Sequence, residues 1–372
     1  MRILITGSNG FVGRNLSAAL SRREGVEILP VARGPSADSL NAALASADVI
    51  FHLAGINRPN DVAEYETGNA GFTAGICAKL IAAGRKPKIV FASSSQAELE
   101  NPYGISKRKA EESLRHYSEK TGAAVVIYRL KNLFGKWCRP NYNSVTATFC
   151  HNIAHDLPIQ ISNPQNVVEL TYIDDVIAAF VSELPAADAP SAGGFSFAGP
   201  LASHAISLGD LAAMIRGFRE HRKSLRLPDL SSPFVRALYA TYLSYLETDD
   251  FAYGLDIKTD NRGSLAEFLK SPAGGQIFVS RTRPGITRGN HFHHTKTEKF
   301  LVLSGEAIIR FRQISGDKVI EYRVKGEDYR VVDIPPGYTH SIENVGSGEM
   351  VTLFWASEIF DPAKPDTAFL NV

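Results

Sequence analysis

The chain has 372 residues, a length that predicts two or three domains and excludes a single small module. Its 40 Lys and Arg residues against 39 Asp and Glu residues give a formal net charge of +1, so no global field attracts nucleic acid or an acidic membrane surface. Hydrophobic residues at 44% and charged residues at 21% exclude long disorder. These figures predict a folded globular protein whose partners are small molecules or protein.

The cysteine count and the lack of long apolar runs indicate the compartment. Three cysteines leave an odd number and no CxxC pair, which fits a reducing compartment better than a disulfide framework. The N-terminal segment Met1–Gly7 turns polar too early for a signal peptide, and no later run approaches about 18 uncharged apolar residues. We therefore expect a cytoplasmic protein with no membrane insertion and no nucleic acid partner.

Up to about residue 185, short apolar runs bounded by turn residues alternate with longer helical patterns. This rhythm is that of βαβ units, in which parallel strands form one sheet. It predicts a Rossmann-like α/β fold, a doubly wound parallel sheet whose strands include Ile3–Ile5, Glu27–Val31, Asp48–Leu53, Lys88–Ala92 and Val125–Tyr128.

From about Leu255 onward, short Val-, Ile- and Phe-rich runs follow one another through Gly and Pro turns without helices. This pattern predicts an all-β sandwich or barrel with strands at Gln276–Arg281, Lys299–Leu303, Ala307–Arg312, Val331–Ile334 and Met350–Trp355. Between the two parts, a segment rich in Pro and Gly ends in a helical pattern over Tyr239–Leu246. We therefore expect two domains, residues 1–247 and 248–372.

A glycine pattern, T-G-S-N-G-F-V-G over Thr6–Gly13, follows the first predicted strand and opens a helix. Gly7 lets the chain turn, Gly10 lets backbone N–H groups approach a pyrophosphate, and Gly13 lets the helix pack on the sheet. The helix N-terminus then favours the phosphate charge, so the pattern predicts a dinucleotide site. Arg33 follows the second strand, where an NAD enzyme usually carries an acid. It favours the 2′-phosphate of NADP, with a solvated loop residue as the alternative.

A tyrosine and a lysine lie four residues apart at the start of a predicted helix, with Asn101 as its N-cap and Pro102 at its first position. Tyr103 and Lys107 therefore share one helix face. A lysine ammonium beside a phenol favours the phenolate, so we expect it to lower the Tyr pKa and prepare the phenol to exchange a proton with a carbonyl or alcohol oxygen. A serine run, Ser93–Ser95, ends the preceding strand, where a hydroxyl can bond the same reacting oxygen.

These motifs together resemble the extended short-chain dehydrogenase/reductase family, with further matches at Leu53-Ala54-Gly55, Arg129–Gly135 and Tyr172–Asp175. The resemblance implies catalytic roles for Tyr103, Lys107 and one serine, for which we prefer Ser94 over Ser95, and a nucleotide-sugar substrate. The predicted cofactor-binding residues are Gly7, Gly10, Phe11, Val12, Arg33, Leu53, Ala54, Gly55, Tyr103 and Lys107. Family members that eliminate water place an Asp-Glu pair directly after the Ser or Thr. Here Ser95-Gln96 follow Ser94, which disfavours dehydration and leaves reduction or 4-epimerisation.

The second part carries a histidine cluster with the spacing of a metal site. On a strand, His291 and His293 point to one face, and Glu298 and His340 can join them from neighbouring strands around one divalent metal. The pattern resembles the two motifs of the cupin barrel, a jelly roll, although the glycine of the second motif lies too far before Pro335. Histidines that only form hydrogen bonds are the alternative, and His294 is interpreted as exposed.

A second resemblance, to the cupin-type epimerases of deoxysugar nucleotides, covers Asp260–Gly263, Pro284–His291 and Pro336–His340. Those enzymes act next to a C4 ketone, and in them the histidine at the place of His291 is a base that needs no metal. His291 is therefore either a base or a ligand. Arg288 and Tyr338, within the same motifs, are predicted to bind substrate.

The whole chain resembles the CapF/WbjC-type family of bacterial surface-polysaccharide enzymes, including the segment Asn132–Ser144. The resemblance implies a bifunctional homodimeric enzyme of UDP-N-acetyl-L-fucosamine synthesis. Its cupin half, with zinc, epimerises C3 of UDP-2-acetamido-2,6-dideoxy-4-ketohexose, and its other half reduces C4 with NADPH to UDP-N-acetyl-6-deoxy-L-talosamine. The predicted substrate contacts of this segment are Asn132, Lys136, Trp137 and Asn143, with an ordered loop as the alternative for the last three.

Two further hypotheses stay open on the sequence. In the first, the reductase works and the cupin is only a sugar-binding or structural module, as the loose second motif allows. In the second, the chain is a non-enzymatic NADP sensor, against which the intact Tyr103 and Lys107 argue. Epimerisation followed by reduction has a chemical logic, because a C–H beside a ketone is acidic only while the ketone exists.

Overall fold

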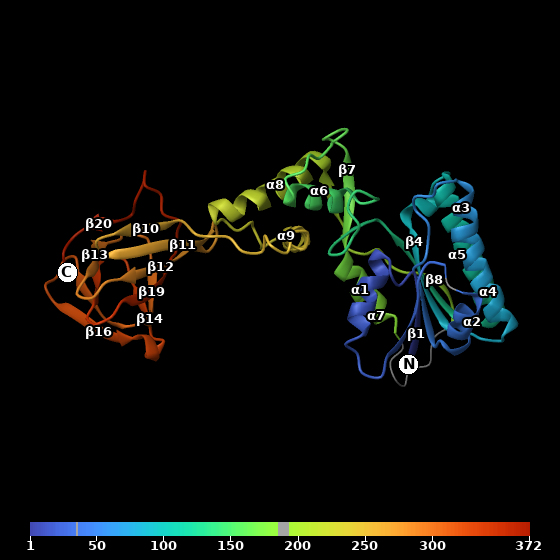
Figure 1. The fold of residues 1–372 in the computed structure, drawn as a ribbon, viewed down its shortest axis with the longest axis horizontal. Helices are drawn as coiled ribbons and strands as arrows, with labels where there is room; N and C mark the ends of the chain where they lie inside the picture. The colour runs from blue at the N-terminus through green and yellow to red at the C-terminus, as the bar shows by residue number, and fades with distance from the viewer. Residues whose placement is uncertain (35, 185–192) are drawn as a thin grey trace. The chain divides into compact units, whose positions relative to one another are not determined.

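The computed structural model describes residues 1–34, 36–184 and 193–372. The described chain forms two compact units, shown as ribbons in Figure 1. The first unit comprises Met1–Ile215 with Ala237–Leu246, and the second comprises Arg216–Arg236 with Glu247–Val372. The division expected after residue 247 stays a prediction for the folding domains, and the contacts assign Arg216–Arg236 to the second unit.

The first unit is built on a six-stranded sheet in which every neighbouring pair is parallel. Across the sheet the strands are β2 (Glu27–Val31), β1 (Arg2–Thr6), β3 (Val49–His52), β4 (Lys88–Ser94), β5 (Ala124–Leu130) and β8 (Gly194–Phe197). The five strands predicted here are confirmed, and so is the Rossmann-like, doubly wound sheet.

Alternate residues of β1 face two separate apolar layers. Leu4 is buried with side chains of α2, α4 and α5, whereas Ile3 and Ile5 are buried with side chains of α1 and α7. Figure 1 shows these helix groups on opposite faces of the sheet, which explains why β1 is a continuous apolar run. The helices are α1 (Phe11–Leu20), α2 (Ala37–Ser46), α3 (Ala63–Tyr65), α4 (Phe72–Ala82), α5 (Pro102–Thr121) and α7 (Ile173–Ser182), with shorter turns η1 (Glu66–Gly71) and η2 (Ser95–Glu98).

A small sheet and three helices stand beside these elements in the chain before the all-β part. The sheet is β6 (Asn132–Phe134), β7 (Val167–Tyr172) and β9 (His204–Ser207), and the helices are α6 (Val145–Ala154), α8 (Leu208–Ser224) and α9 (Pro233–Leu243). The helix predicted over Tyr239–Leu246 is present, but it begins earlier and ends earlier. The Ser232 hydroxyl accepts from the Val235 N–H at 3.4 Å, so a serine N-cap followed by Pro233 starts α9.

Besides Arg216–Arg236, the second unit contains two antiparallel sheets. One is β10 (Ile257–Asp260), β11 (Gly263–Ser271), β12 (Gly275–Thr282), β19 (Met350–Ala356), β14 (Glu298–Ser304) and β17 (Val331–Ile334). The other is β16 (Val319–Lys325), β15 (Glu306–Gln313), β18 (Tyr338–Asn344), β13 (Thr287–Phe292) and β20 (Ala368–Phe369), and η3 (Gly326–Asp328) is a single turn. The all-β prediction is confirmed, together with the five predicted strands.

The two sheets face each other across one interior. Phe300 of the first sheet shares a buried apolar cluster with Phe311 and Ile342 of the second. Polar side chains are buried as well: His340 and Thr352 are 0% exposed. Buried polar groups are costly unless they are hydrogen-bonded, so a cluster of them in an apolar interior indicates a candidate functional site.

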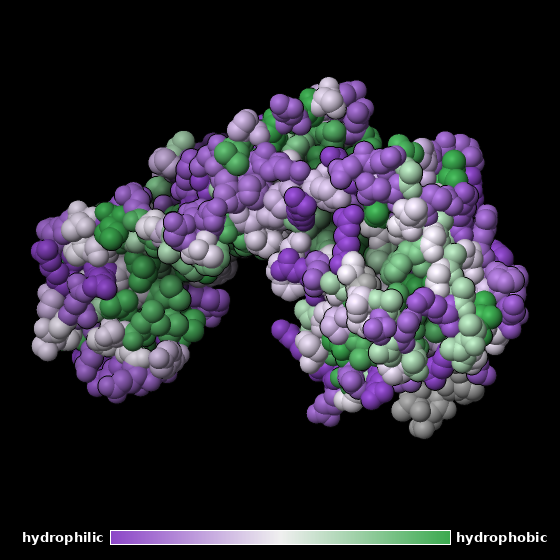
Figure 2. Space-filling model, turned by 45° about the vertical axis from the view of Figure 1, so that its right-hand side comes forward, coloured by the Kyte–Doolittle hydropathy of each residue, from purple (hydrophilic) through white to green (hydrophobic). Residues whose placement is uncertain are grey.

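The outer surface and the cysteines agree with the composition. In Figure 2, hydrophilic residues lie over both units, and hydrophobic residues gather on the face that it draws of the C-terminal unit. Within residues 1–34, 36–184 and 193–372, no helix is both long enough and apolar enough to span a bilayer. Cys77, Cys138 and Cys150 are buried free thiols, as their odd number indicated.

Gly13 and Gly75 test whether the close approach at the start of α1 is required. A Cβ on Gly13 would lie 2.3 Å from the Gly7 carbonyl oxygen, whereas a Cβ on Gly75, in α4, would meet nothing within 4 Å. Gly13→Ala should therefore lower the free energy of unfolding by about 1–3 kcal/mol through overpacking. The matched Gly75→Ala should raise it by up to about 1 kcal/mol through helix propensity. Urea unfolding measures both, and equal stability of the two variants would contradict the proposed contact.

Candidate functional site

The turn between β1 and α1 packs directly on the backbone that follows β3. Gly7 has a φ of +69°, and its N–H donates to the Val31 carbonyl at 2.8 Å. A Cβ on Gly7 would lie 2.9 Å from the Ala54 backbone and 3.0 Å from that of Leu53. Only glycine allows both the positive φ and this approach. Three of the predicted cofactor residues are thereby brought together.

The start of α1 is open to an anion. Gly10 is its N-cap with no side-chain cap, and the first turn carries no acidic residue. Phe11 and Val12, partly buried, anchor this turn on the apolar layer that α1 shares with α7. The first backbone N–H groups of a helix have no partner within it, so they favour a phosphate there.

Arg33 lies in the loop after β2 with its side chain 85% exposed, and its Nη2 is 3.8 Å from the Glu64 carboxylate. An exposed ion pair of this kind is weak. The guanidinium is therefore available to an anion, and its preference for the NADP 2′-phosphate stays a prediction.

Strand β4 and helix α5 bring the predicted catalytic residues together. Asn101 caps α5 by accepting from the Gly104 N–H at 2.8 Å, as predicted, and this fixes the turn that carries Tyr103. The Tyr103 phenol is hydrogen-bonded to Ser94 at the end of β4. Ser93 instead donates to Glu111 at 2.5 Å. Among the three serines, Ser94 is therefore the one placed at the phenol.

Burial raises the pKa of Tyr103, and the bond with Ser94 only partly opposes this. The expectation that Lys107 lowers this pKa is wrong in this structure. The Lys107 ammonium donates to the Ala92 carbonyl at 2.8 Å and lies 4.7 Å from the Phe91 ring centroid. The phenol is consequently protonated at neutral pH, which is the form that can give a proton.

Lys107 itself is buried and 5% exposed. Burial lowers its pKa to about 8, and the nearby Glu111 carboxylate opposes that shift. Glu111 is held in turn by Arg129, with Nη2 2.6 Å from Oε2. A cation with this pKa is charged at neutral pH and loses its charge in mildly alkaline solution.

The predicted substrate segment lies at the carboxyl edge of the parallel sheet, in β6 and the loop after it: Asn132, Lys136, Trp137 and Asn143. Lys136 forms an ion pair of 2.5 Å with Asp174, and Trp137 is 42% exposed with a φ of +69°. Asn143 accepts from Arg58 at 3.3 Å, which ties the loop to the segment after β3. Asn132 is exposed at the start of β6. Their contacts with substrate stay a prediction.

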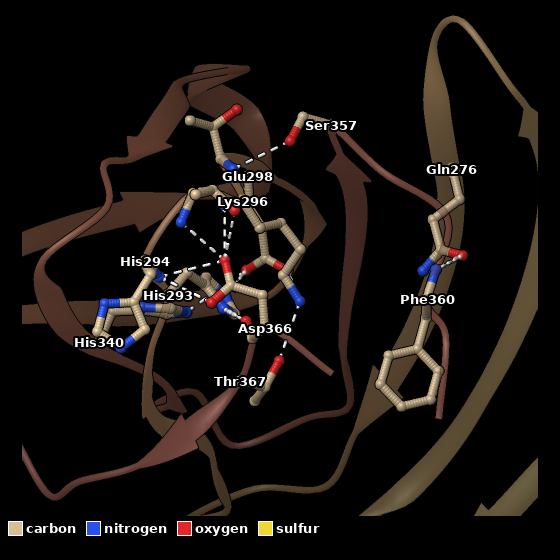
Figure 3. A network of polar contacts seen from close by, with 12 residues as sticks. Gln276, His293, His294, Lys296, Glu298, His340, Ser357, Phe360, Asp366 and Thr367 are labelled. Atoms are coloured by element: carbon tan, nitrogen blue, oxygen red, sulfur yellow. Dashed lines mark hydrogen bonds and ion pairs between the residues drawn. The ribbon is translucent and has the colours of Figure 1, made fainter. Parts of the chain in front are cut away.

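In the second unit, four predicted residues converge in the interior between the sheets, and Figure 3 draws His293, Glu298 and His340 among them. His291 of β13 pairs in register with His340 of β18, while His293 follows β13 and Glu298 begins β14. Their ligand atoms all lie within 4.8 Å of one another. The fold therefore gathers three imidazoles and one carboxylate, as the spacing predicted.

The tautomer of His293 turns a lone pair toward this cluster. Its Nδ1 lies 2.5 Å from the Asp366 carbonyl oxygen, which only accepts, so Nδ1 carries the proton. Its Nε2 then points a lone pair at Glu298 Oε2, 3.4 Å away, and lacks a hydrogen-bond partner. His340 Nε2 is also buried, without a partner, and 3.4 Å from the same oxygen. Acceptors that face one another without protons fit a divalent cation.

Burial lowers the pKa of His291 to about 4, and His340 adds to this shift. Burial raises the pKa of Glu298, and positive charge at the Nε2 atoms of His293 and His340, from a proton or a bound cation, outweighs burial and lowers it. The imidazole of His291 is therefore neutral and the carboxyl of Glu298 is ionised at pH 7. A neutral imidazole serves equally as a ligand or as a base, so both roles of His291 stay open.

The remaining predicted residues of this unit lie at the edge of the cluster or outside it. Arg288, half-buried on β13, donates to Thr282 Oγ1 at 2.9 Å. Tyr338 is partly buried against the apolar core at the start of β18. His294 is exposed and takes no part in the cluster, as interpreted from the sequence.

Comparison with known proteins assigns the chain to a family. The sequence profile described as "NAD dependent epimerase/dehydratase family" matches residues 3–194, and the profile "Polysaccharide biosynthesis C-terminal domain" matches residues 258–368. The chain is also 46% identical, over 375 residues, to UDP-2-acetamido-2,6-beta-L-arabino-hexul-4-ose reductase of Pseudomonas aeruginosa, covering 100% of this chain and 99% of the relative. The chain belongs to the NAD-dependent epimerase/dehydratase family.

Solved structures agree with this assignment. The capsular polysaccharide assembling protein CapF from Staphylococcus aureus is similar over 100% of both chains, with 45% identity and a TM-score of 0.90. UDP-glucuronic acid 4-epimerase from Bacillus cereus, 19% identical, matches 66% of this chain and 99% of its own with a TM-score of 0.56, which shows the fold alone. The protein is thus a CapF-type member of the epimerase/dehydratase family, with the parallel-sheet and all-β units on one chain.

Family membership implies a nicotinamide dinucleotide, and the β1–α1 turn fits one. A Cβ on Gly7 would collide with the backbone of Ala54, and a Cβ on Gly13 would collide with the Gly7 carbonyl. The start of α1, which no side chain caps, suits the pyrophosphate. Gly55 lies beside Lys107, because a Cβ there would be 3.3 Å from Lys107 Nζ. In this CapF-type protein the predicted cofactor and catalytic residues therefore occupy one edge of the sheet.

Sequence reasoning missed the polar groups that hold this edge together. Asn69 is buried, accepts from the Ile56 N–H at 2.7 Å and donates to Ser106 of α5 at 3.0 Å. His52 is buried between Thr6 and Thr73, with ring nitrogens at 2.7 and 2.8 Å from their hydroxyls. His52 could have been noticed in the sequence, because it is a polar residue in an otherwise apolar strand. Asn69 could not, because it lies on the π-helical turn η1, for which there is no sequence pattern.

Removing a histidine tests the metal-binding role of the cluster. The wild-type protein should bind one divalent ion per chain, and His293→Ala should lower that affinity by at least tenfold because a ligand is lost. The adjacent exposed His294→Ala should leave the affinity unchanged. Equilibrium dialysis with zinc, after removal of metal by a chelator, measures both variants. Equal loss in both, or binding undisturbed by His293→Ala, would contradict the assignment.

Proposed function

We propose that this protein is a bifunctional nucleotide-sugar enzyme of UDP-N-acetyl-L-fucosamine synthesis. Its second unit, as a cupin-type epimerase holding a metal ion such as zinc, inverts C3 of UDP-2-acetamido-2,6-dideoxy-4-ketohexose. Its first unit reduces the C4 ketone with NADPH and yields UDP-N-acetyl-6-deoxy-L-talosamine. The active protein is a homodimer.

The observation that carries the proposal is the full-length relationship to a reductase named for a UDP-linked 4-ketosugar. A partial match would support only a shared fold, but here both units are covered at 46% identity. The side chains that such chemistry requires are present in each unit: Ser94, Tyr103 and Lys107 in the first, and the imidazole cluster in the second. The printed name of the relative specifies a reductase, so the epimerase step rests on the cluster.

Epimerisation begins with a proton at C3, which is acidic because the anion delocalises onto the C4 oxygen. A neutral imidazole in the cluster removes it, and His291, the least buried of the three, is best placed to reach substrate. His293, Glu298 and His340 would hold a divalent ion, which when bound would supply positive charge for the enolate oxygen. Return of a proton to the opposite face of C3 inverts the carbon. Arg288 and Tyr338 contact the substrate.

Reduction requires a proton for the C4 oxygen, and NADPH, when bound, supplies the hydride for C4. Tyr103, protonated because burial raises its pKa, gives its hydroxyl proton to that oxygen. The Ser94 hydroxyl bonds the same oxygen and orients it. Lys107 holds positive charge beneath the site while it donates to Ala92. The predicted loop residues Lys136, Trp137 and Asn143 bind the nucleotide sugar, and Arg33 selects NADPH over NADH.

Proton NMR with UDP-4-keto-6-deoxy-N-acetylhexosamine in deuterium oxide tests both steps in one tube. Without NADPH, solvent deuterium should enter C3, and added NADPH should then be consumed. Tyr103→Phe should keep the exchange and lower reduction by about 10²–10⁴-fold, because the general acid is lost. Tyr117→Phe, on the same helix with its hydroxyl bonded to Pro87, is the matched control and should reduce normally.

The outcomes separate the competing hypotheses. NADPH consumption without prior exchange at C3 would leave a reductase whose second unit only binds sugar or stabilises the chain. Exchange and reduction that both persist in Tyr103→Phe would overturn the catalytic assignment. Absence of NADPH consumption by the wild type would overturn the proposed function.

The pH dependence of reduction should report Lys107. Because its pKa in the folded protein is about 8, kcat/KM should fall above about pH 8 as the ammonium loses its proton. Lys107→Met should lose activity, and with it the fall of kcat/KM above about pH 8. This fall should remain in the control Lys109→Met, an exposed residue of the same helix that pairs with Glu66.

The stability of the protein should change in the opposite direction. Between about pH 8 and 10.5, the ordinary pKa of lysine, Lys107 keeps its proton in the unfolded chain and has released it in the folded one. The contribution of Lys107 to the free energy of unfolding therefore rises with pH in this range.

A further inference from the structure

The segment from Asp366 to Leu370 contacts the imidazole cluster from outside the two motifs that contain its four residues (Figure 3). We propose that this segment is a clamp for the metal site and that Asp366 is its main positioning residue, setting the affinity for a divalent cation. The proposal rests on the proposed metal-binding function of the cluster and concerns residues that supply no ligand themselves.

The Asp366 carboxylate closes the turn between His293 and Glu298. It accepts from the backbone N–H groups of His294, Thr295 and Lys296 at 2.9, 2.8 and 2.8 Å. It also accepts from Thr295 Oγ1 at 3.0 Å. Three successive N–H groups that point to one carboxylate fix the path of the turn, and with it the spacing of the two ligands at its ends.

The backbone of the same residue fixes a ligand directly. The Asp366 carbonyl oxygen accepts from Nδ1 of His293, which orients the ring and keeps the Nε2 lone pair in the cluster. A metal-ligating histidine usually gives its second N–H to such an acceptor, which sets the tautomer and the ring plane. The carboxylate and the carbonyl of one residue thus hold both the loop and the ring of His293.

The clamp extends to the carboxylate ligand through Lys296. Lys296 Nζ donates to Thr367 Oγ1 at 3.0 Å and lies 4.0 Å from Glu298 Oε1. Lys296 is only 8% exposed, so its ammonium is a buried charge that needs these partners. Thr367 therefore keeps the Lys296 ammonium beside Glu298 Oε1, while Glu298 Oε2 faces the imidazoles.

Strand β20 extends the clamp to the other two histidines. Phe369 pairs with His291 in the antiparallel ladder of β13 and β20. The Leu370 carbonyl accepts from the hydroxyl of Thr339, the residue before His340. Each of the four cluster residues is therefore held, directly or through one neighbour, by a segment that joins the site from the end of the described chain.

Metal affinity of the full-length protein tests the clamp. Zinc binding, measured by competition with a chromophoric chelator, should weaken about 10–100-fold in Asp366→Ala, the usual range for partners of metal ligands. Asp366→Asn keeps one acceptor oxygen without the charge and should give an intermediate loss. Asp361→Ala is the matched control, because Asp361 precedes the clamp and its carboxylate accepts from the Ala363 N–H at 2.9 Å. It should bind zinc as the wild type does.

Two further readouts distinguish positioning from stability alone. The thermal unfolding midpoint of the metal-free Asp366→Asn protein should stay close to that of the metal-free wild type. The visible absorption of its cobalt-loaded form should differ, because the ligand rings are no longer held in one geometry. Wild-type zinc affinity in both Asp366 variants would overturn the clamp alone. A loss of affinity matched by a lower metal-free midpoint and an unchanged cobalt spectrum would also overturn it. A wild-type protein that binds no zinc would overturn both the metal-binding proposal and the clamp.

Discussion

The second unit depends on one constraint: polar atoms buried between its sheets must find partners. His293 Nε2 and His340 Nε2 are buried without hydrogen bonds, each 3.4 Å from the same carboxylate oxygen. An arrangement of lone pairs facing lone pairs is unfavourable unless a cation or protons lie among them. The strand register of His291 and His340 and the bonds of Asp366 keep the groups together despite this cost. Geometry that is maintained against its own electrostatics is typical of a site built for a ligand.

In the first unit, the buried charged groups have hydrogen-bond and ion-pair partners within the protein. The buried Lys107 ammonium has the Ala92 carbonyl and the Phe91 ring, and the nearby Glu111 carboxylate has Ser93 and Arg129. Ser93 is engaged with Glu111, and Ser94 rather than Ser93 is placed to bond the phenol of Tyr103. The bond of Ser93 to Glu111 thus leaves Ser94 as the neighbour of the Tyr103 phenol.

The sequence predicted the elements that carry periodicity and missed those that depend on distant contacts. The glycine turn and the Asn101 cap were predictable because each is encoded in local spacing. The cluster of His291, His293, Glu298 and His340 was predictable because two separate motifs with strand patterns supply its members. Asp366 was not, since it lies 70 to 72 residues beyond the backbone N–H groups that it holds and follows no motif. The expected effect of Lys107 on the Tyr103 pKa was wrong for a related reason. Helical spacing places the two side chains on one face, but burial and the Ala92 carbonyl, both tertiary effects, decide the outcome.

Burial has opposite chemical consequences at the two sites, and both suit the proposed reaction. It penalises the charged form of any group, so it raises the pKa of the Tyr103 phenol and lowers that of the His291 imidazole. The phenol consequently keeps its proton and can give it to an alkoxide, while the imidazole lacks one and can take it from a carbon acid. Inversion at C3 requires the C4 ketone, and reduction removes that ketone together with the acidity it confers. A chain that carries a proton acceptor for the first step and a proton donor for the second can therefore make the new stereocentre and then fix it.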